Sequence, residues 1–312
     1  MSSRLLPRKV RVNDSDIHVV ETIPDTPSAA PTIVLVSGLG YTAATWAATQ
    51  RLLPTTLRTF AYDRLGLNNS DPTTLDRHAS LLAQELKDTL TACNVPTPYL
   101  LVGWSYGGCI IREYLEAFDE DVAGLVYVDA NHERSHVERQ WPVELTFRLD
   151  PKAFSIGDQT GLDNDHRCTS EEWDVLVKEQ DRRNALAIGG PGEWTLYAAS
   201  LDALGEHRQL DRRALGNRPI SVIQANTTRD FQRILEAAKK SGRGTAEDHQ
   251  EMEKFIEHFT AVELRLNYDM LRLSNIHRMV ITSISGHFVP WVEPQLCVEE
   301  IKWCLDHLEK SH

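Results

Sequence analysis

Ser105 lies between two glycines in the stretch GWSYGG (103–108), where the apolar run YLLVG (99–103) gives way to a helical pattern. A serine hydroxyl is a weak nucleophile unless it is held clear of its neighbours, close to a base and to donors for an oxyanion. A sharp turn from strand to helix achieves the first of these, and Gly103 and Gly107 remove side chains that would collide in such a turn. A serine that only caps the helix would show the same local pattern. Ser105 is therefore a candidate nucleophile for acyl transfer, provided that other segments supply a base and oxyanion donors.

Two backbone N–H groups could hold the oxyanion of that chemistry. Leu39 lies between two glycines in VLVSGLG (34–40), at the end of a predicted buried strand, and Tyr106 follows Ser105 at the start of the predicted helix. The N-terminal end of a helix favours negative charge nearby. A plain glycine turn after a strand would also explain the first segment. We predict the N–H groups of Leu39 and Tyr106 as the oxyanion donors, each contributing about 3 kcal/mol to transition-state stabilisation.

A general base is expected near the carboxyl end of the chain. His287 stands in SISGHFVPWVEP (283–294), between the last predicted strand and the last predicted helix. Histidine side chains ordinarily titrate near neutral pH, so they can take a proton from a hydroxyl without a large perturbation. The chain holds 12 histidines, but His287 is the one that follows the last predicted strand in a Gly-His turn. We therefore predict His287 as the base.

Two aspartates could orient the imidazole of His287. Asp230 lies shortly after a predicted strand over 219–225, and it could equally be an ordinary helix N-cap. Asp129 ends the predicted strand GLVYVD (124–129), where its carboxylate could reach the same imidazole or only brace the neighbouring loops. The order serine, acid, histidine along the chain admits both. Residue types and spacing leave this choice open.

These residues need a sheet whose strands end at a common edge. The chain opens with a predicted β-hairpin (10–23), and short apolar runs follow at 32–37, 57–62, 99–103, 122–128, 219–225 and 277–284. Apolar runs in which apolar and polar residues do not strictly alternate are typical of strands buried on both faces, as in a parallel sheet. A helix is predicted over 73–92, with an apolar stripe formed by Leu75, Ala79, Leu82, Leu86 and Leu90. Strands alternating with helices predict an α/β fold with a mostly parallel central sheet flanked by helices.

The alternation of strands and helices is interrupted twice. Residues 131–217 mix tryptophan-containing helical patterns with loop-rich stretches, and we predict that they form a mainly helical cap. This cap would be inserted into a core made of residues 1–130 and 218–312. Residues 231–276 are predicted as a second, helical excursion between the last two strands, with one long amphipathic helix.

Composition limits the classes of partner. The net charge of −12 over 312 residues opposes binding to nucleic acid, which requires clustered Lys and Arg. The N-terminal stretch has no apolar signal-peptide region and no run approaches the roughly 18 apolar residues of a membrane span, so we expect a cytoplasmic protein. Five dispersed cysteines without a CxxC suggest neither a disulfide framework nor a zinc site. No P-loop or dinucleotide-binding motif is present, so we expect no cofactor, and a homo-oligomer is left open.

Taken together, four segments resemble the α/β-hydrolase superfamily over nearly the whole chain. They are SGLG (37–40), YDRLGLNNSD (62–71), GWSYGG (103–108) and SGHFVPWVEP (285–294). The resemblance implies the α/β-hydrolase fold with an inserted cap and a serine hydrolase of the esterase or lactonase type. Two departures from the usual pattern concern the oxyanion side of the site: Asn68 stands in place of a second glycine, and Ser37 in place of a frequent histidine.

The resemblance also bears on the acid. Some relatives, including lactonases acting on resorcylic macrolactones, place their acid after the strand that corresponds to 122–128. A microbial subgroup that this chain resembles lacks a regular acid after the penultimate strand. The resemblance therefore implies Asp129 as the triad acid, with Asp230 as the alternative.

The expected substrate is a small, largely hydrophobic carboxylic ester or lactone, cleaved through an acyl-enzyme intermediate. Trp141, Trp173 and Trp194 of the predicted cap could form an apolar roof, although each could also belong to the core of the cap itself. A serine nucleophile disfavours the epoxide hydrolase and haloalkane dehalogenase reactions that resembling enzymes carry out with aspartate. Amidase, thioesterase and C–C bond hydrolase reactions stay open, as does a small-molecule receptor of the same fold with little turnover.

Overall fold

The computed structural model describes residues 5–26, 29–151, 161–186 and 192–308, with side chains up to Glu179 in the third range. Its centre is an eight-stranded sheet in the order β1-β2-β4-β3-β5-β6-β7-β8. The strands are β1 (Leu6–Val12), β2 (Ser15–Thr22), β3 (Thr32–Val36), β4 (Thr59–Tyr62), β5 (Tyr99–Trp104), β6 (Val122–Val128), β7 (Ile220–Gln224) and β8 (His277–Ile281). β2 pairs antiparallel with β1 and β4, and the other pairings are parallel. The predicted α/β fold with a mostly parallel sheet is confirmed.

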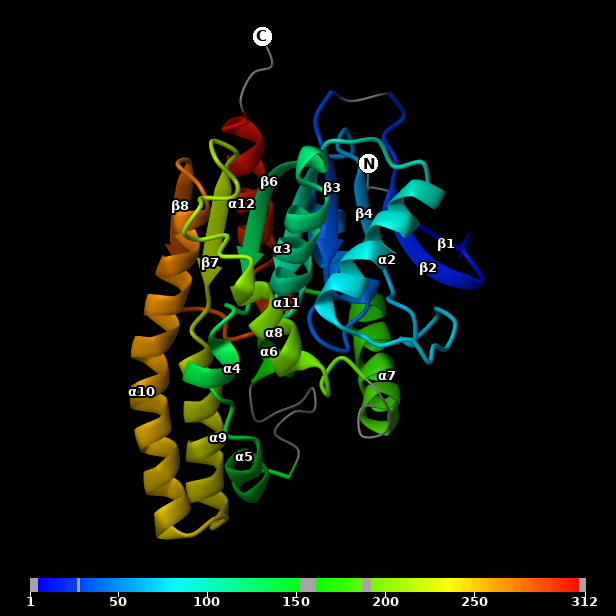
Figure 1. The fold of residues 1–312 in the computed structure, drawn as a ribbon. Helices are drawn as coiled ribbons and strands as arrows, with labels where there is room; N and C mark the ends of the chain where they lie inside the picture. The colour runs from blue at the N-terminus through cyan, green and yellow to red at the C-terminus, as the bar shows by residue number, and fades with distance from the viewer. Residues whose placement is uncertain (1–4, 27–28, 152–160, 187–191, 309–312) are drawn as a thin grey trace.

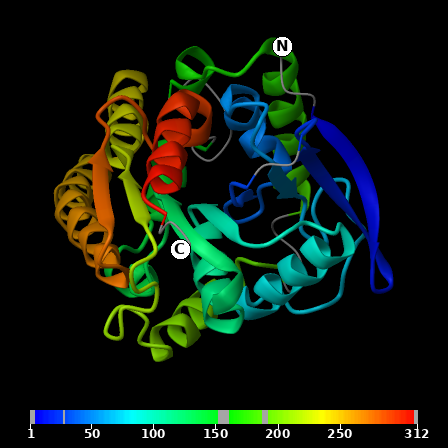
Figure 2. The ribbon, with the colours of Figure 1, turned by 90° about the horizontal axis from the view of Figure 1, so that it is seen from above.

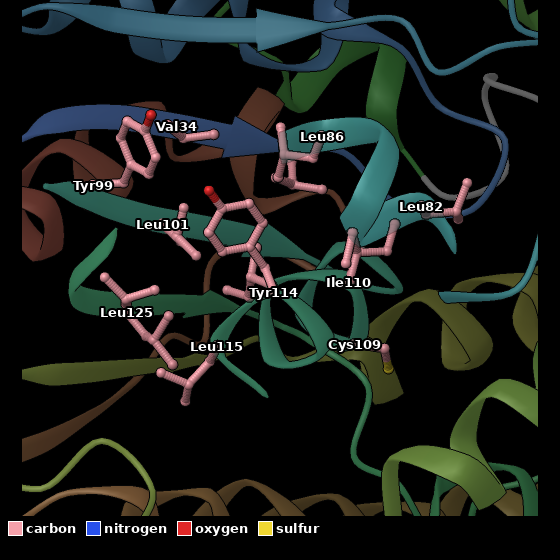
Figure 3. Packing of buried hydrophobic residues seen from close by; sticks show 14 of the residues in the cluster. Val34, Leu82, Leu86, Tyr99, Leu101, Cys109, Ile110, Tyr114, Leu115 and Leu125 are labelled. Atoms are coloured by element: carbon pink, nitrogen blue, oxygen red, sulfur yellow. The ribbon is translucent and has the colours of Figure 1, made fainter. Parts of the chain in front are cut away.

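Helices cover both faces of this sheet (Figures 1 and 2). α2 (Ala79–Ala92) and α3 (Gly107–Ala117) lie on one face, and η1 (Ala43–Trp46), α1 (Ala47–Leu52) and α12 (Pro294–Asp306) lie on the other. Figure 3 shows the first face, where Leu86 of α2 and Ile110 of α3 belong to one buried cluster with Val34 and Leu101 of the sheet. Because both faces are covered, β3, β5 and β6 are almost entirely buried and consist mostly of apolar residues.

The helix predicted over 73–92 begins later than expected. α2 starts at Ala79, where the side chain of the N-cap residue His78 accepts a hydrogen bond from the Ser80 N–H. This bond satisfies one of the first N–H groups of the helix, which have no partner within it. Leu75 precedes the helix and is 63% exposed, so it does not belong to the buried stripe.

Two long helical segments interrupt the core. Between β6 and β7 lie α4 (Ser135–Glu138), α5 (Val143–Leu149), α6 (Leu162–Asp165), α7 (Ser170–Leu186) and α8 (Tyr197–Glu206). Residues 152–160 and 187–191 of the predicted cap lie outside the described residues. Between β7 and β8 lie α9 (Thr227–Ser241), α10 (Ala246–Met270) and η3 (Leu271–Leu273). The shorter η2 (Asp119–Asp121) and α11 (Val289–Val292) complete the described elements.

The two segments pack against each other. An apolar cluster joins α5, α9 and α10, and its buried members include Leu145, Phe231, Met252 and Phe259. Figure 1 shows α5, α9 and the N-terminal part of α10 beyond the end of the sheet to which the strand arrows point. The segments therefore meet at the carboxyl edge of the sheet.

Strand register brings the residues of interest to that same edge. Val36 of β3 is opposite Gly103 of β5, which is opposite Tyr127 of β6. In the next pair, Val128 is opposite Ile223 of β7. The residues that follow these four strands consequently emerge side by side, because parallel strands end in the same direction.

Candidate active site

Ser105 occupies the turn between β5 and α3. Its φ of 54° is in the left-handed region, which residues other than glycine rarely adopt. Its N–H donates to the Val128 carbonyl at 3.1 Å, and its side chain is half-buried. A Cβ on Gly103 would lie 2.7 Å from the Gly107 carbonyl carbon, and a Cβ on Gly107 would overlap the Val36 carbonyl oxygen. The turn therefore holds Ser105 in a strained conformation, and close packing requires both glycines.

Asp129 contacts the imidazole of His287. The Nδ1 atom of His287 is 2.7 Å from Oδ2 of Asp129, whose side chain is 1% exposed. The carboxylate also accepts hydrogen bonds from the Ala225 N–H at 3.1 Å and the Thr227 hydroxyl at 2.8 Å. Burial alone would raise the pKa of Asp129, but the hydrogen bond and charge of His287 and the charge of Arg139 hold it below its ordinary value. The carboxylate therefore stays ionised and orients the imidazole.

The His287 loop is attached to the residue that precedes Ser105. The indole N–H of Trp104 donates to the His287 carbonyl at 2.8 Å, and the two rings lie 5.2 Å apart. Since Asp129 occupies Nδ1, Nε2 is the ring nitrogen left for proton transfer. The structure thus brings the Ser105 turn, His287 and Asp129 to one edge of the sheet, where the Ser105 hydroxyl donates to Oδ1 of Asn131 at 3.4 Å.

Asp230 contacts the backbone of the same loop rather than the imidazole. Its Oδ2 accepts a hydrogen bond from the His287 N–H at 3.0 Å. A Cβ on Gly286 would overlap this carboxylate, so the loop passes directly over it. Burial raises the pKa of Asp230, although the neighbouring Arg229 opposes this. The N-cap of α9 is Asn226, so Asp230 is not a cap but a brace for the His287 turn.

The two predicted oxyanion donors border Ser105. Gly38 lies against it, since a Cβ on Gly38 would be 3.1 Å from the Cβ of Ser105, and Leu39 follows directly. Tyr106 is the N-cap residue of α3, and its buried hydroxyl donates to Ser200 of α8 at 3.0 Å. Both N–H groups therefore come from segments that flank Ser105.

Aromatic rings surround the imidazole of His287. Besides Trp104, Trp141 meets it edge to face at 5.6 Å, and Phe288 lies at 5.7 Å. Trp141 also packs on Phe231 of α9. The rings beside the imidazole thus come from the core and from the segment between β6 and β7, and α9 contributes through its contact with Trp141.

The three tryptophans of the predicted cap have different surroundings. Trp173 stacks on His166 at 3.8 Å and meets Trp291 at 6.2 Å. Trp194 is 57% exposed and stacks on Tyr197. Trp141 thus lies beside the imidazole and Trp194 is largely exposed, and the apolar roof of three tryptophans stays a prediction.

Two buried ion pairs near the site were not predicted. Arg139, which follows α4, pairs with Glu263 of α10, and burial raises the pKa of Glu263 to about 6 despite the opposing charge of Arg139. Arg64, which follows β4, pairs with Glu193 of the segment between β6 and β7. Arg64 stands in the segment YDRLGLNNSD (62–71), where a charged residue soon after a predicted buried strand could have indicated a buried ion pair. Glu193 lies in a loop-rich stretch and offered no such signal.

The described residues contain no group of three or more His, Cys, Asp or Glu side chains placed to hold a metal ion. None of the described helices combines the length and the apolar character needed to cross a membrane.

Comparison with known proteins identifies the family. A family model described as alpha/beta hydrolase family matches residues 33–300. The chain belongs to this family. The resemblance stated from the four sequence segments is confirmed. An AB hydrolase superfamily protein from Gibberella zeae is 30% identical over 287 residues, which cover 89% of this chain and 87% of that protein.

Solved structures share the α/β-hydrolase fold. Carboxylesterase CesB (YbfK) from Bacillus subtilis has a TM-score of 0.59 at 15% identity, with 97% of this chain and 92% of that chain covered. Est816, an N-acyl homoserine lactone degrading enzyme, has a TM-score of 0.59 at 15% identity, with 95% of this chain and 99% of that chain covered. Membership of the α/β-hydrolase family supports a hydrolase activity, whereas these structural likenesses show the fold alone.

Proposed function

We propose that this α/β-hydrolase is a serine hydrolase that cleaves a carboxylic ester or lactone of a small, largely hydrophobic substrate. The observation that carries the proposal is the 2.7 Å contact between Asp129 and His287, made beside the turn that holds Ser105 at a φ of 54°. An ionised buried carboxylate on an imidazole, next to a serine in a strained turn, is the arrangement that activates a hydroxyl for acyl transfer.

In the proposed reaction, Ser105 Oγ attacks the carbonyl carbon while Nε2 of His287 takes the hydroxyl proton. Negative charge moves to the carbonyl oxygen, where the N–H groups of Leu39 and Tyr106 hold it. The C–O bond then breaks, and His287 returns the proton to the leaving oxygen, which leaves an acyl group on Ser105. A water molecule that His287 deprotonates attacks this acyl group and releases the acid, with the proton returned to Ser105. A lactone follows the same steps and yields a single hydroxy acid.

Asp129 has two roles in this proposal. Its contact with Nδ1 keeps the ring proton on that nitrogen, so that Nε2 is an acceptor when substrate arrives. Its negative charge then stabilises the imidazolium that forms during the attack. Asp230 supports the reaction less directly, by holding the backbone of the His287 turn.

The substrate class rests on the surroundings of the site. We propose residues 131–217 as a cap over the carboxyl edge of the sheet, with the helical excursion 231–276 packed on it through the apolar cluster. Trp141 and Phe288 beside the imidazole favour an apolar acyl or alcohol group over a charged one. The ester and lactone activities named for CesB and Est816 support the same reaction class.

Labelling and turnover test the proposal together. A fluorophosphonate probe should modify the purified protein at Ser105, and a panel of p-nitrophenyl esters and lactones should include a substrate. The Ser105→Ala variant should lose both the label and the turnover while keeping the unfolding curve of the wild type. Turnover that survives in this variant would contradict the proposal, and ligand binding without any turnover in the wild type would favour a receptor.

A further inference from the structure

We propose that Glu193 is a positioning residue for the oxyanion turn, residues 37–40, and that it acts through Arg64. Glu193 comes from the segment between β6 and β7, whereas the turn and Arg64 belong to the core. The inference rests on the proposed function, since it concerns the orientation of one of the two donors assigned to the oxyanion.

Arg64 binds two successive carbonyl groups of the turn. Its side chain is fully buried, Nη1 donates to the Ser37 carbonyl at 2.9 Å, and Nη2 donates to the Gly38 carbonyl at 2.6 Å. Donors of one planar guanidinium have fixed relative directions, so the two carbonyl groups are held together.

Two hydrogen bonds to the Gly38 carbonyl, from Arg64 and from the Tyr41 N–H at 3.0 Å, set which way the Leu39 N–H points. The Gly38 carbonyl and the Leu39 N–H belong to the same trans peptide unit, in which they point in opposite directions. With the carbonyl held toward Arg64, the N–H is directed away from Arg64. A rotation of this peptide would turn the N–H back and place the carbonyl oxygen, which repels an oxyanion, on the other side. Arg64, together with the Tyr41 N–H, therefore holds the donor that the proposed reaction needs.

Glu193 holds both Arg64 and the far end of the turn. Its Oε1 accepts from Nε of Arg64, and its Oε2 accepts from Nη2 of Arg64 at 2.9 Å. The same Oε2 accepts the Gly40 N–H at 2.7 Å. Leu39 is thus flanked on one side by a carbonyl bound to Arg64 and on the other by an N–H bound to Glu193.

The carboxylate is needed because the guanidinium is buried. An unpaired charge in a protein interior is strongly unfavourable, and the neutral carbonyl groups of the turn do not balance it. Glu193 is itself only 6% exposed, so its carboxylate also needs a partner of opposite charge, and Arg64 supplies it. Without this carboxylate, Arg64 would turn toward water or another acceptor, and the Gly38 carbonyl would lose one of the two hydrogen bonds that hold it.

The chain offers a matched control for this contact. Glu172 of α7 joins the same segment to the core through an ion pair with Arg51 at 2.8 Å, and among the described residues it makes no hydrogen bond to the oxyanion turn. A variant of Glu172 therefore weakens attachment of the segment and leaves the turn untouched.

The test compares Glu193→Gln with Glu172→Gln. The glutamine keeps the size and one acceptor oxygen but not the charge, so kcat should fall about 10- to 100-fold while KM stays within about threefold. A boronic acid that forms a tetrahedral adduct on Ser105 should lose affinity in parallel with kcat/KM, because it requires the same donors. The Glu172→Gln variant should stay within about twofold of the wild type in all three quantities.

A second variant makes the test independent of how well the first folds. In Arg64→Lys the positive charge for Glu193 is kept, but a single ammonium does not bridge two carbonyl groups as a fork, so the same loss of kcat and boronate affinity is expected. Wild-type kcat in either folded variant would overturn the inference, as would an equal loss in Glu172→Gln. If the wild type hydrolyses no ester or lactone, the proposed function fails instead, so the two failures are distinguishable.

Discussion

Replacement of Asp129 by asparagine separates the two candidate acids. In the native site Oδ1 accepts the Ala225 N–H at 3.1 Å, and Oδ2 faces Nδ1 of His287 at 2.7 Å. The amide oxygen of Asp129→Asn can keep the bond from Ala225, and the amide N–H₂ then faces Nδ1. The amide N–H and a protonated Nδ1 would both be donors and could not form a hydrogen bond with each other. Nδ1 therefore becomes the acceptor, and the ring proton moves to Nε2. In that tautomer His287 is unable to take the proton from Ser105.

The loss should be large, and it should appear in kcat. Loss of the correct tautomer together with the stabilising charge costs about four orders of magnitude in kcat in a triad of this kind, or about 5.4 kcal/mol of transition-state stabilisation. Substrate binding does not use the carboxylate, which is 1% exposed, so KM should change little. Folding should persist, because the variant has the shape of the native side chain.

The matched variant is Asp230→Asn. Asp230 accepts the His287 N–H at 3.0 Å, and an amide oxygen can replace the carboxylate in that bond. Since the contact between Asp129 and the imidazole is unchanged, kcat should fall less than about tenfold, or 1.4 kcal/mol. Steady-state hydrolysis of the best ester from the panel, with stability followed by urea unfolding, measures both variants. A loss of three orders of magnitude in Asp230→Asn with near-native Asp129→Asn would refute the assignment.

Three further expectations concern packing and burial. Gly107→Ala should give no stable fold or lose several kcal/mol in urea unfolding, because the new methyl group would overlap the Val36 carbonyl oxygen; native stability would contradict the close approach. Leu82→Ala should cost about 2–5 kcal/mol, whereas Leu75→Ala, at a 63% exposed side chain, should cost less than about 0.5 kcal/mol; equal costs would place both in the core. Burial raises the pKa of Glu263 from 4.5 to about 6, so the folded protein binds this proton more tightly than the unfolded chain does. Relative to Glu263→Gln, the wild type should therefore gain about 2 kcal/mol of unfolding free energy as the pH falls, mostly between pH 6 and pH 4.5, and parallel stability curves would refute this.

The choice between the two aspartates shows where local pattern stops being informative. Asp129 and Asp230 each follow a strand of the sheet and precede His287 in the chain. The contact with the imidazole joins residues 158 positions apart, and the contact with the backbone N–H joins residues 57 positions apart. Which carboxylate meets which atom depends on how the last loop folds over the sheet edge, and no spacing encodes that. The exposed position of Leu75 has a similar cause, since the N-cap at His78 and not the apolar repeat starts the helix.

The sequence by itself determined the α/β alternation, the glycine-flanked turn of Ser105 and the loop that carries His287. These depend on neighbours along the chain: apolar runs make strands that are buried on both faces, and glycines two residues before and after a serine allow a turn that other side chains would block. The tertiary structure alone decided that Asp129 meets the imidazole, that Trp194 is exposed, and that Glu193 pairs with Arg64 across 129 positions. The physical reason is that the surroundings of a side chain come from segments distant in the sequence: a buried charge is stabilised by the partner that the fold brings within contact distance, and a ring stays exposed where the fold brings nothing over it.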